Sequence, residues 1–179
     1  MKNQKLHIMM ETVLMAVLAF ILSFIPIKTT NFDIAIGLVP IILLGLRHGV
    51  LPSSTAGLIW GLLDLISGKA SILNPWQGFI EYIIAFAFAG LCGVFANKMA
   101  KTPHPNLIII AATATGVIAR YLWHFIAGGI FWGAFAPKTI NPWIFSFISN
   151  GLSALATIIV VSLVLILMHR YAAKLFQLA

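Results

Sequence analysis

One carboxylic acid lies inside an otherwise apolar segment of this sequence. Residues 74–96 read NPWQGFIEYIIAFAFAGLCGVFA, and Glu81 is the only acid among them. An ionised group at the centre of a membrane helix costs roughly 2.5–3.5 kcal/mol on insertion scales, so such a residue suggests a functional site with a specific partner. A buried carboxylate can provide the counter-charge for a cationic ligand.

Four further side chains have the chemistry that such a ligand would need. His124 and Asn150 offer hydrogen bonds, and Trp60 and Trp132 offer indole faces. An aromatic face attracts a cation by about 2 kcal/mol or more once both are desolvated. Together with Glu81 these groups suit a flat organic cation, whereas a metal ion would need more oxygen or nitrogen ligands close together.

Each of these residues also has a structural interpretation. Trp132 can be an interfacial anchor, as expected for the tryptophans at helix starts, Trp76 and Trp143. His124 can satisfy a backbone carbonyl. Asn150 can hold helices together, because it belongs to a stripe of polar residues on one helix face. The stripe consists of Ser146, Asn150, Ser153 and Thr157.

Two charged residues near these candidates leave alternatives open. Arg120 precedes His124 by one helical turn. If Arg120 pairs with Glu81, the acid is neutralised and the pair is structural; if Arg120 turns elsewhere, Glu81 is available to a cationic ligand. Asp64 lies near the end of its apolar segment and is expected to be solvated.

The composition indicates a membrane protein. Of the 179 residues, 61% are hydrophobic and 8% are charged, and the mean hydropathy is +1.04. A water-soluble fold of this size would expose apolar patches far larger than the few hundred Å² found on monomers. The single cysteine, Cys92, excludes an internal disulfide and a cysteine zinc cluster.

The sequence predicts an all-α bundle of six transmembrane helices in a single membrane domain, residues 1–179. The first apolar stretch is too long for the core of a signal peptide, and no cleavage pattern follows it. The second and third segments are shorter than the roughly 20 residues that cross a bilayer, so they are expected to be tilted, re-entrant or packed inside the bundle. The segments are Leu6–Ile27, Ile34–Leu46, Val50–Ile66, Pro75–Ala96, Leu107–Phe135 and Trp143–His169.

The distribution of positive charge predicts that both termini are cytoplasmic. That orientation places seven basic residues inside and three outside, and it accounts for the net charge of +7 without a nucleic-acid partner. At 1.5 Å per helical residue, Trp60, Glu81, His124 and Asn150 then all lie roughly 9–11 Å below the outer surface. The inner residues are Lys2, Lys5, Arg47, Lys98, Lys101, Arg170 and Lys174; the outer ones are Lys28, Lys69 and Lys138.

The chain resembles the thiamine-specific substrate-binding (S) components of energy-coupling factor (ECF) transporters over nearly its whole length. The sequences GFIEY and HFIAGGIFW carry the most specific part of the resemblance. The stretches that carry it are Val39–Gly49, Gly57–Gly93, His124–Lys138 and Ser146–Thr157.

The resemblance implies a six-helix bundle with an outward-facing site between helices 4, 5 and 6, closed by loops. In such proteins the site holds the thiazolium and aminopyrimidine rings of thiamine. Phe145 stands where the family pattern has a tyrosine, and Phe32 takes the place of an aromatic lid. The site residues implied are Trp60, Glu81, Tyr82, His124, Gly128, Trp132, Phe145 and Asn150.

The resemblance also implies partners. S components do not hydrolyse ATP, and this sequence lacks the GxxxxGK[ST] phosphate loop. No cofactor is expected in this chain, since ATP is used by two nucleotide-binding subunits that act with a membrane coupling subunit. Docking to that subunit is expected through small residues on helix 1, which allow close backbone approach in the lipid bilayer. These residues are Thr12, Ala16, Ala19 and Ser23.

Three other functions are alternatives to a thiamine-binding S component. An intramembrane enzyme would need an oriented nucleophile or a metal set, and neither GxSxG nor HExxH occurs. A self-sufficient ion-coupled carrier usually has inverted repeats and broken helices, which the sequence does not suggest. An S component for another vitamin, such as riboflavin, is the alternative within the class, but a neutral vitamin would not require Glu81.

Overall fold

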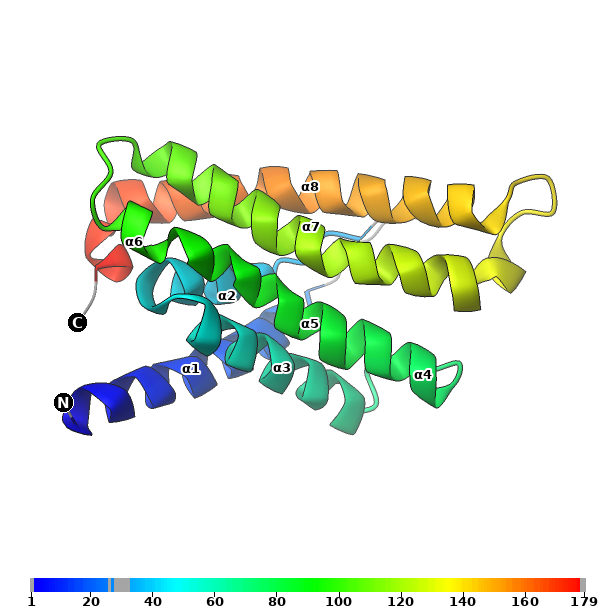
Figure 1. Ribbon diagram of the computed structural model, residues 1–179, viewed down its shortest axis with the longest axis horizontal. Coiled ribbons are helices and arrows are strands. Elements are labelled where there is room, and N and C mark those ends of the chain that lie inside the picture. Colours follow the sequence, from blue (N-terminus) through cyan, green and yellow to red (C-terminus); the bar gives the residue numbers. More distant parts are fainter. Residues whose placement is uncertain (1, 26, 28–32, 178–179) are drawn as a thin grey trace.

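The computed structural model describes residues 2–25, 27 and 33–177. These residues form the predicted all-α bundle of six helical segments (Figure 1). Four of the segments are long and apolar enough to cross a membrane, and the other two are shorter apolar helices. The segments are α1 (Lys2–Leu22), α2 (Leu38–His48), α3 (Val50–Ile66), the composite helix Pro75–Met99, α7 (Pro105–Phe131) and α8 (Pro142–Tyr171).

The observed helix ends differ most from the predicted ones at the connection between α1 and α2. The helix α1 ends at Leu22 instead of residue 27, and α2 begins at Leu38 instead of residue 34. A proline at position 26 disfavours helix at the residue before it, which helps to end the first segment early. The helix α3 has the predicted bounds.

The short helix α2 lies inside the bundle, one of the three arrangements expected for it. All nine of its residues from Leu38 to Leu46 are buried. A helix that is apolar on every side is typical of such a position. A single residue, Gly49, separates α2 from α3, and its φ of 87° is a conformation that glycine adopts without strain.

The fourth segment changes its winding along its length. It begins as α4 (Pro75–Gly78), continues as the π-helix η1 (Phe79–Ile84) and α5 (Ala85–Phe88), and ends as the 3₁₀ helix η2 (Ala89–Phe95) and α6 (Ala96–Met99). Asn74 caps its start, because its Oδ1 accepts hydrogen bonds from the backbone of Trp76 and Gln77, each at 3.0 Å. The Asn-Pro-Trp sequence recurs at the start of α8, where Asn141 Oδ1 accepts one hydrogen bond, from the backbone of Trp143 at 2.9 Å.

Two glycines bring α3 against this composite helix. A Cβ atom on Gly61 would lie 1.8 Å from the carbonyl oxygen of Tyr82, and one on Gly57 would lie 2.1 Å from that of Phe86. Glycines four residues apart on one helix face permit such close backbone approach. This contact sets the position of Tyr82 and its neighbour Glu81 relative to α3.

The structure contradicts the prediction that small residues of α1 form a partner surface. Thr12, Ala16 and Ala19 are buried within the bundle, where α1 packs against α2 and α3. Close packing inside the chain therefore accounts for their small size. The outward face of α1 carries large apolar residues instead, including Val13 and Leu14.

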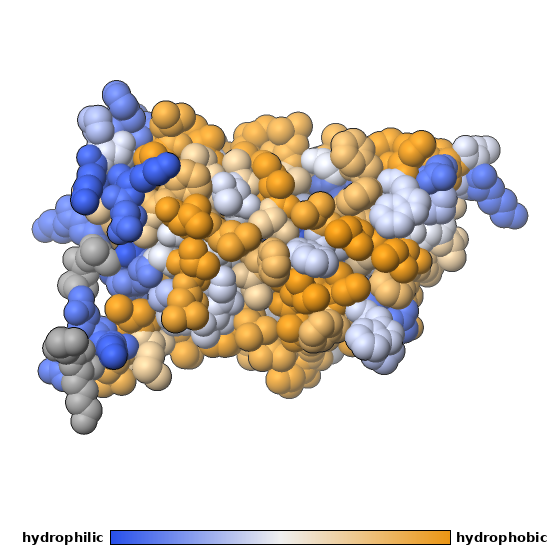
Figure 2. All heavy atoms as spheres, in the orientation of Figure 1, coloured by the Kyte–Doolittle hydropathy of each residue, from blue (hydrophilic) through white to orange (hydrophobic). Residues whose placement is uncertain are grey.

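The surface has the distribution expected of a membrane protein. In Figure 2 apolar side chains cover the middle of the visible face, and polar residues gather at its two ends. Both ends of the chain lie at the same end of the bundle (Figure 1), which we call the terminal end. The 3₁₀ helix η4 (Ala173–Phe176) follows α8 at this end. The 3₁₀ helix η3 (Gly133–Phe135) follows α7 at the opposite end.

Candidate functional site

A cavity of about 260 Å³ lies between α1, α3, the composite helix and α7. Its lining includes four of the predicted site residues, Trp60, Glu81, Tyr82 and His124. The remaining wall comes from the chain after α1, the chain before α2, the connection between α3 and α4, and further residues of α3, α5 and α7. These additional residues are Ser23, Ile25, Asp33–Ile36, Asp64, Lys69, Ser71, Phe86 and Arg120.

Irregular backbone forms one wall because α1 and α2 both stop short of each other. The backbone N–H of Asp33 donates to Ser153 Oγ at 3.1 Å, and that of Ala35 donates to Thr157 Oγ1 at 3.2 Å. Non-helical backbone at membrane depth is tolerated where protein groups satisfy it and it lines a cavity. Two of the four residues in the polar stripe on α8, Ser153 and Thr157, therefore accept hydrogen bonds from the backbone of this wall.

Glu81 is buried beside the cavity, with both carboxylate oxygens held. Oε1 accepts a hydrogen bond from Trp132 Nε1 at 2.8 Å, and Oε2 accepts one from Gln77 Nε2 at 2.5 Å. Its side chain comes from the π-helical turn η1. Single π turns inside α-helices occur frequently at functional sites, because they re-aim side chains.

The connection between α3 and α4 is tied to the same cluster. The backbone N–H of Ser71 donates to Tyr82 Oη at 2.9 Å, and Gln77 Nε2 also donates to the Ser71 carbonyl at 3.1 Å. Gln77 in turn accepts from the backbone of Leu73 at 3.0 Å. Ordering of this loop and positioning of Glu81 thus depend on one buried amide.

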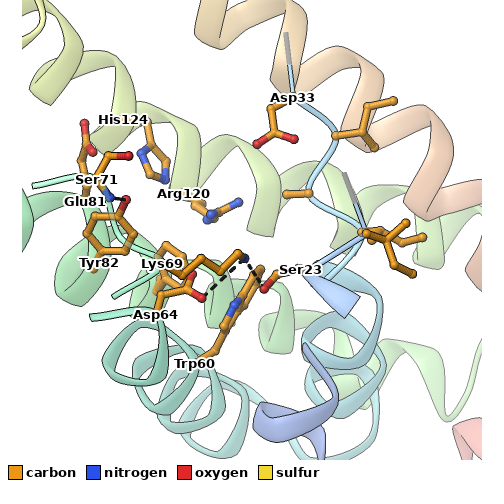
Figure 3. Close-up of a pocket in the computed structure, with 15 residues that line it drawn as sticks. Ser23, Asp33, Trp60, Asp64, Lys69, Ser71, Glu81, Tyr82, Arg120 and His124 are labelled. Carbon is orange, nitrogen blue, oxygen red and sulfur yellow. Dashed lines mark hydrogen bonds and ion pairs between the residues drawn. The ribbon is translucent and has the colours of Figure 1, made fainter. Parts of the chain in front are cut away.

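Arg120 does not pair with Glu81 among the described residues. Its guanidinium carbon lies 4.4 Å from the ring centroid of Phe86 and 5.1 Å from that of Trp60. The side chain projects into the cavity (Figure 3). Its position shows that the aromatic faces of this cavity can receive a planar cation.

Three nitrogen atoms of residues that line the cavity have no hydrogen-bond partner within the described part of the chain. They are Trp60 Nε1, Arg120 Nε and His124 Nε2, and all three are buried. Buried polar atoms of this kind are rare in folded proteins. Their side chains belong to the cavity lining.

The expectation that Asp64 is solvated was wrong. Asp64 is 5% exposed and lines the cavity, with Lys69 Nζ 3.6 Å from its Oδ1. Lys69 also donates to Ser23 Oγ. Figure 3 shows Lys69 between Asp64 and Ser23, so this lysine bridges α1 and α3 at one side of the cavity. Ser23 belongs to the cavity and not to a docking stripe.

The remaining predicted residues lie outside the cavity lining. Trp132 reaches the site through its hydrogen bond to Glu81. Asn150 donates to the carbonyl of Ser146 at 3.0 Å, and Ser146 Oγ lies 2.2 Å from where a Cβ on Gly128 would be. These residues join α8 to α7. Phe145 is half-buried near the start of α8, and Phe32 lies outside the described residues.

Sequence reasoning missed Gln77, Ser71, Lys69 and the cavity position of Asp64. Gln77 had a usable signal, because it precedes Glu81 by four residues and so shares its helix face. No sequence pattern indicated the positions of Ser71 and Lys69, because both lie in the connection between α3 and α4, which has no helical periodicity. Among the described residues no group of three His, Cys, Asp or Glu side chains could hold a metal ion.

The arrangement can bind a small organic cation. A buried carboxylate provides charge, Trp60 and Phe86 provide ring faces, and His124 and Tyr82 provide hydrogen-bonding edges. The cavity mixes a few polar groups with apolar walls, as small-molecule sites do.

Comparisons with known proteins agree with this geometry. Residues 9–177 match the family described as "Thiamine transporter protein". A protein named thiamine transporter ThiT from Lacticaseibacillus paracasei is 38% identical over 186 residues, which cover 98% of this chain and 92% of that protein. One with the same name from Bacillus subtilis is 32% identical over 151 residues, covering 81% and 79%. The solved structure of ThiT from Listeria monocytogenes has a TM-score of 0.93 and 36% identity, covering 98% of this chain and 100% of that one.

Proposed function

Because this chain belongs to the thiamine transporter protein family, we propose that it captures thiamine in the cavity beside Glu81. The observation that carries the proposal is a buried carboxylate at a cavity with aromatic walls. Thiamine has a permanent positive charge on its thiazolium ring and a flat aminopyrimidine ring, so it matches both features. The chain is then the high-affinity binding subunit of a transporter and not an enzyme.

Each predicted site residue has a role in this proposal. Glu81 is the counter-charge, and Trp132 and Gln77 hold it in place. Trp60 and Phe86 present ring faces, from which the Arg120 guanidinium must withdraw if the thiazolium lies there. His124 and Tyr82 contact the ring edges. Gly128, Phe145 and Asn150 complete the site after a small movement of α8 toward the ligand.

The energy for transport comes from partner subunits in this proposal. The chain acts as the S component of an ECF-type importer, with a membrane coupling subunit and two ATP-hydrolysing subunits. In lipid vesicles the chain alone should bind thiamine without accumulating it, and uptake should require the partners and ATP. Accumulation by this chain alone would contradict the assignment.

The ligand is tested by isothermal titration calorimetry on the purified full chain. Thiamine should bind, and riboflavin at the same concentrations should give no heat of binding, because it has no fixed positive charge for Glu81. Mass spectrometry of the protein as isolated identifies any molecule that accompanies it. Binding of riboflavin in preference to thiamine would assign a different vitamin to the site.

Both chain termini lie in the cytoplasm in this proposal, and the cavity is loaded from the outer face. The excess of basic residues at the terminal end supports this orientation through the positive-inside rule.

A further inference from the structure

A second cavity, of about 290 Å³, opens at the terminal end, far along the bundle from Glu81. It lies between α2, α6, the end of α8 and η4. Its lining combines buried apolar side chains with polar ones. The residues that matter are Leu46, Met99 and Phe176, which are buried and apolar, and Arg47, Asn97 and His169.

Arg47 has unused hydrogen-bonding capacity at this cavity. Its Nη1 lies 2.8 Å from Glu11 Oε1, whereas its Nε is buried and has no hydrogen-bond partner in the described part of the chain. Glu11 is shared with His48, whose Nε2 lies 2.9 Å from Oε2. A guanidinium has five N–H donors, and a buried donor without a partner calls for a specific explanation.

The terminal end has one acidic side chain, Glu11, among the described residues. The sequence has four acids, and Asp33, Asp64 and Glu81 line the first cavity, which leaves Glu11 for this end. Four further basic residues lie on the elements that line the second cavity or directly after them. They are Lys98, Lys101, Arg170 and Lys174.

We propose that this cavity binds a phosphate group, with Arg47 as the charged contact and His169 and Asn97 as hydrogen-bonding neighbours. Guanidinium groups match phosphate oxygens in geometry as well as charge. Basic pockets between membrane helices bind phospholipid head groups at the membrane surface. The apolar surface of Leu46, Met99 and Phe176 can accept the part of a lipid next to its phosphate. A phospholipid head group and free phosphate share this chemistry, and the experiment separates them.

The test measures thermal unfolding of the full chain, freed of lipid in a neutral detergent. Phosphatidylglycerol, phosphatidylcholine and inorganic phosphate are titrated separately. Phosphatidylglycerol should raise the midpoint of unfolding at lower concentration than phosphatidylcholine. A response to inorganic phosphate that equals the response to phosphatidylglycerol identifies a soluble phosphate as the occupant and supports the site. If neither phosphatidylglycerol nor inorganic phosphate changes the midpoint of unfolding, the proposed phosphate site is wrong.

Two variants with the same change in charge test the location. Asn97→Asp adds a negative charge at the cavity, and Lys101→Gln removes a positive one from the neighbouring loop, outside the lining. Asn97 and Lys101 are both exposed, so neither change should disturb folding. Asn97→Asp should raise the anion concentration needed for a given shift of the unfolding midpoint at least about fivefold, through repulsion at close range. The second should change it by less than about twofold. Equal losses would mean that diffuse surface charge binds the anion, which contradicts the proposal. Thiamine affinity, measured in parallel, should not change in either variant.

Discussion

At the residue scale, the site depends on how one carboxylate is held. Glu81 is buried, yet both of its oxygens accept hydrogen bonds from neutral donors, Gln77 and Trp132. Neutral donors orient the group without cancelling its charge, so the carboxylate can still attract a cation. An ion pair with Arg120 would have removed that charge. The guanidinium instead lies over Phe86 and Trp60.

Glu81→Gln should weaken thiamine binding by about 10- to 100-fold, because a hydrogen bond or ion contact to a charged group contributes roughly 1.5–3 kcal/mol. The amide keeps the shape of the side chain and removes its charge. Calorimetry measures the affinity. Glu11→Gln is the matched control, since it makes the same change at the terminal end, and it should leave affinity unaltered. Equal affinity in Glu81→Gln and the parent would assign the charge role to another acid.

The indole rings make the binding step visible. The sequence has five tryptophans, and Trp60 lines the cavity. Thiamine stacked on this ring should quench the intrinsic fluorescence, and Trp60→Phe should reduce the quenching while retaining most of the ring surface. Trp76→Phe is the control, because Trp76 is 73% exposed and does not line the cavity. An unchanged signal during binding that calorimetry detects would mean that Trp60 does not touch the ligand.

At the scale of single elements, two helices determine the site by departing from regular geometry. The fourth segment places Glu81 on a π-helical turn, and α1 ends early enough for residues 33–36 to form a cavity wall. The buried face of α1 is equally important. Thr12, Ala16 and Ala19 allow this helix to lie against α2 and α3, so their small side chains hold the bundle together.

Deletion of Ile84, at the end of the π turn, should convert this turn into ordinary α-helix. With one residue fewer the wide turn rewinds, which changes the direction in which Glu81 leaves the helix and moves it away from its position beside the cavity. Thiamine binding should be lost while the helical signal in circular dichroism persists. Phe79→Ala is the control, because it changes an exposed side chain in the same turn without altering its winding. Retained binding after the deletion would show that the π turn is not needed.

Ala19→Trp should destabilise the fold. Ala19 is fully buried, and the backbone of Gly37 approaches it closely, because a Cβ there would lie 2.6 Å from the Ala19 carbonyl oxygen. Overpacking of this kind costs typically 1–3 kcal/mol of the free energy of unfolding. Thermal unfolding in detergent measures the loss. Leu18→Trp, at a neighbouring exposed position, should unfold like the parent. A stable Ala19→Trp protein that fails only in uptake would restore this residue to the partner surface.

At the scale of the whole molecule, charge is divided between the two ends of an apolar bundle. Three of the four acids line the cavity that faces one end, and most of the basic residues lie at the terminal end. The positive-inside rule predicts that the terminal end faces the cytoplasm, and we expect the cation to bind near the other end.

The orientation can be tested with cysteine labelling, since the single native cysteine, Cys92, is buried. Thr139→Cys lies in the connection between α7 and α8, and His104→Cys lies in the connection before α7 at the terminal end. A membrane-impermeant maleimide added to intact cells should label the first variant only. Both should react after the membrane is permeabilised. The reverse pattern would mean that the cavity beside Glu81 is loaded from the cytoplasm.

The sequence by itself determined the all-α membrane class and the six segments, because apolar composition and segment length leave few alternatives in a bilayer. It also identified Glu81, since a lone acid in an apolar segment is conspicuous before any folding is considered. Trp60 and His124 were predicted from their depth in the expected helices and from the family resemblance, and Tyr82 from the resemblance alone.

Tertiary structure alone decided how these residues are used. Small residues on α1 have the same pattern whether they face a partner or the chain's own core, and only the packing of α1 on α2 and α3 distinguished the two. The direction of Arg120, the burial of Asp64 and the π turn under Glu81 depend on contacts between segments distant in sequence. The periodicity of a sequence shows which residues share a face of one helix. It does not show which other helix that face contacts, and these contacts form only when the helices pack together.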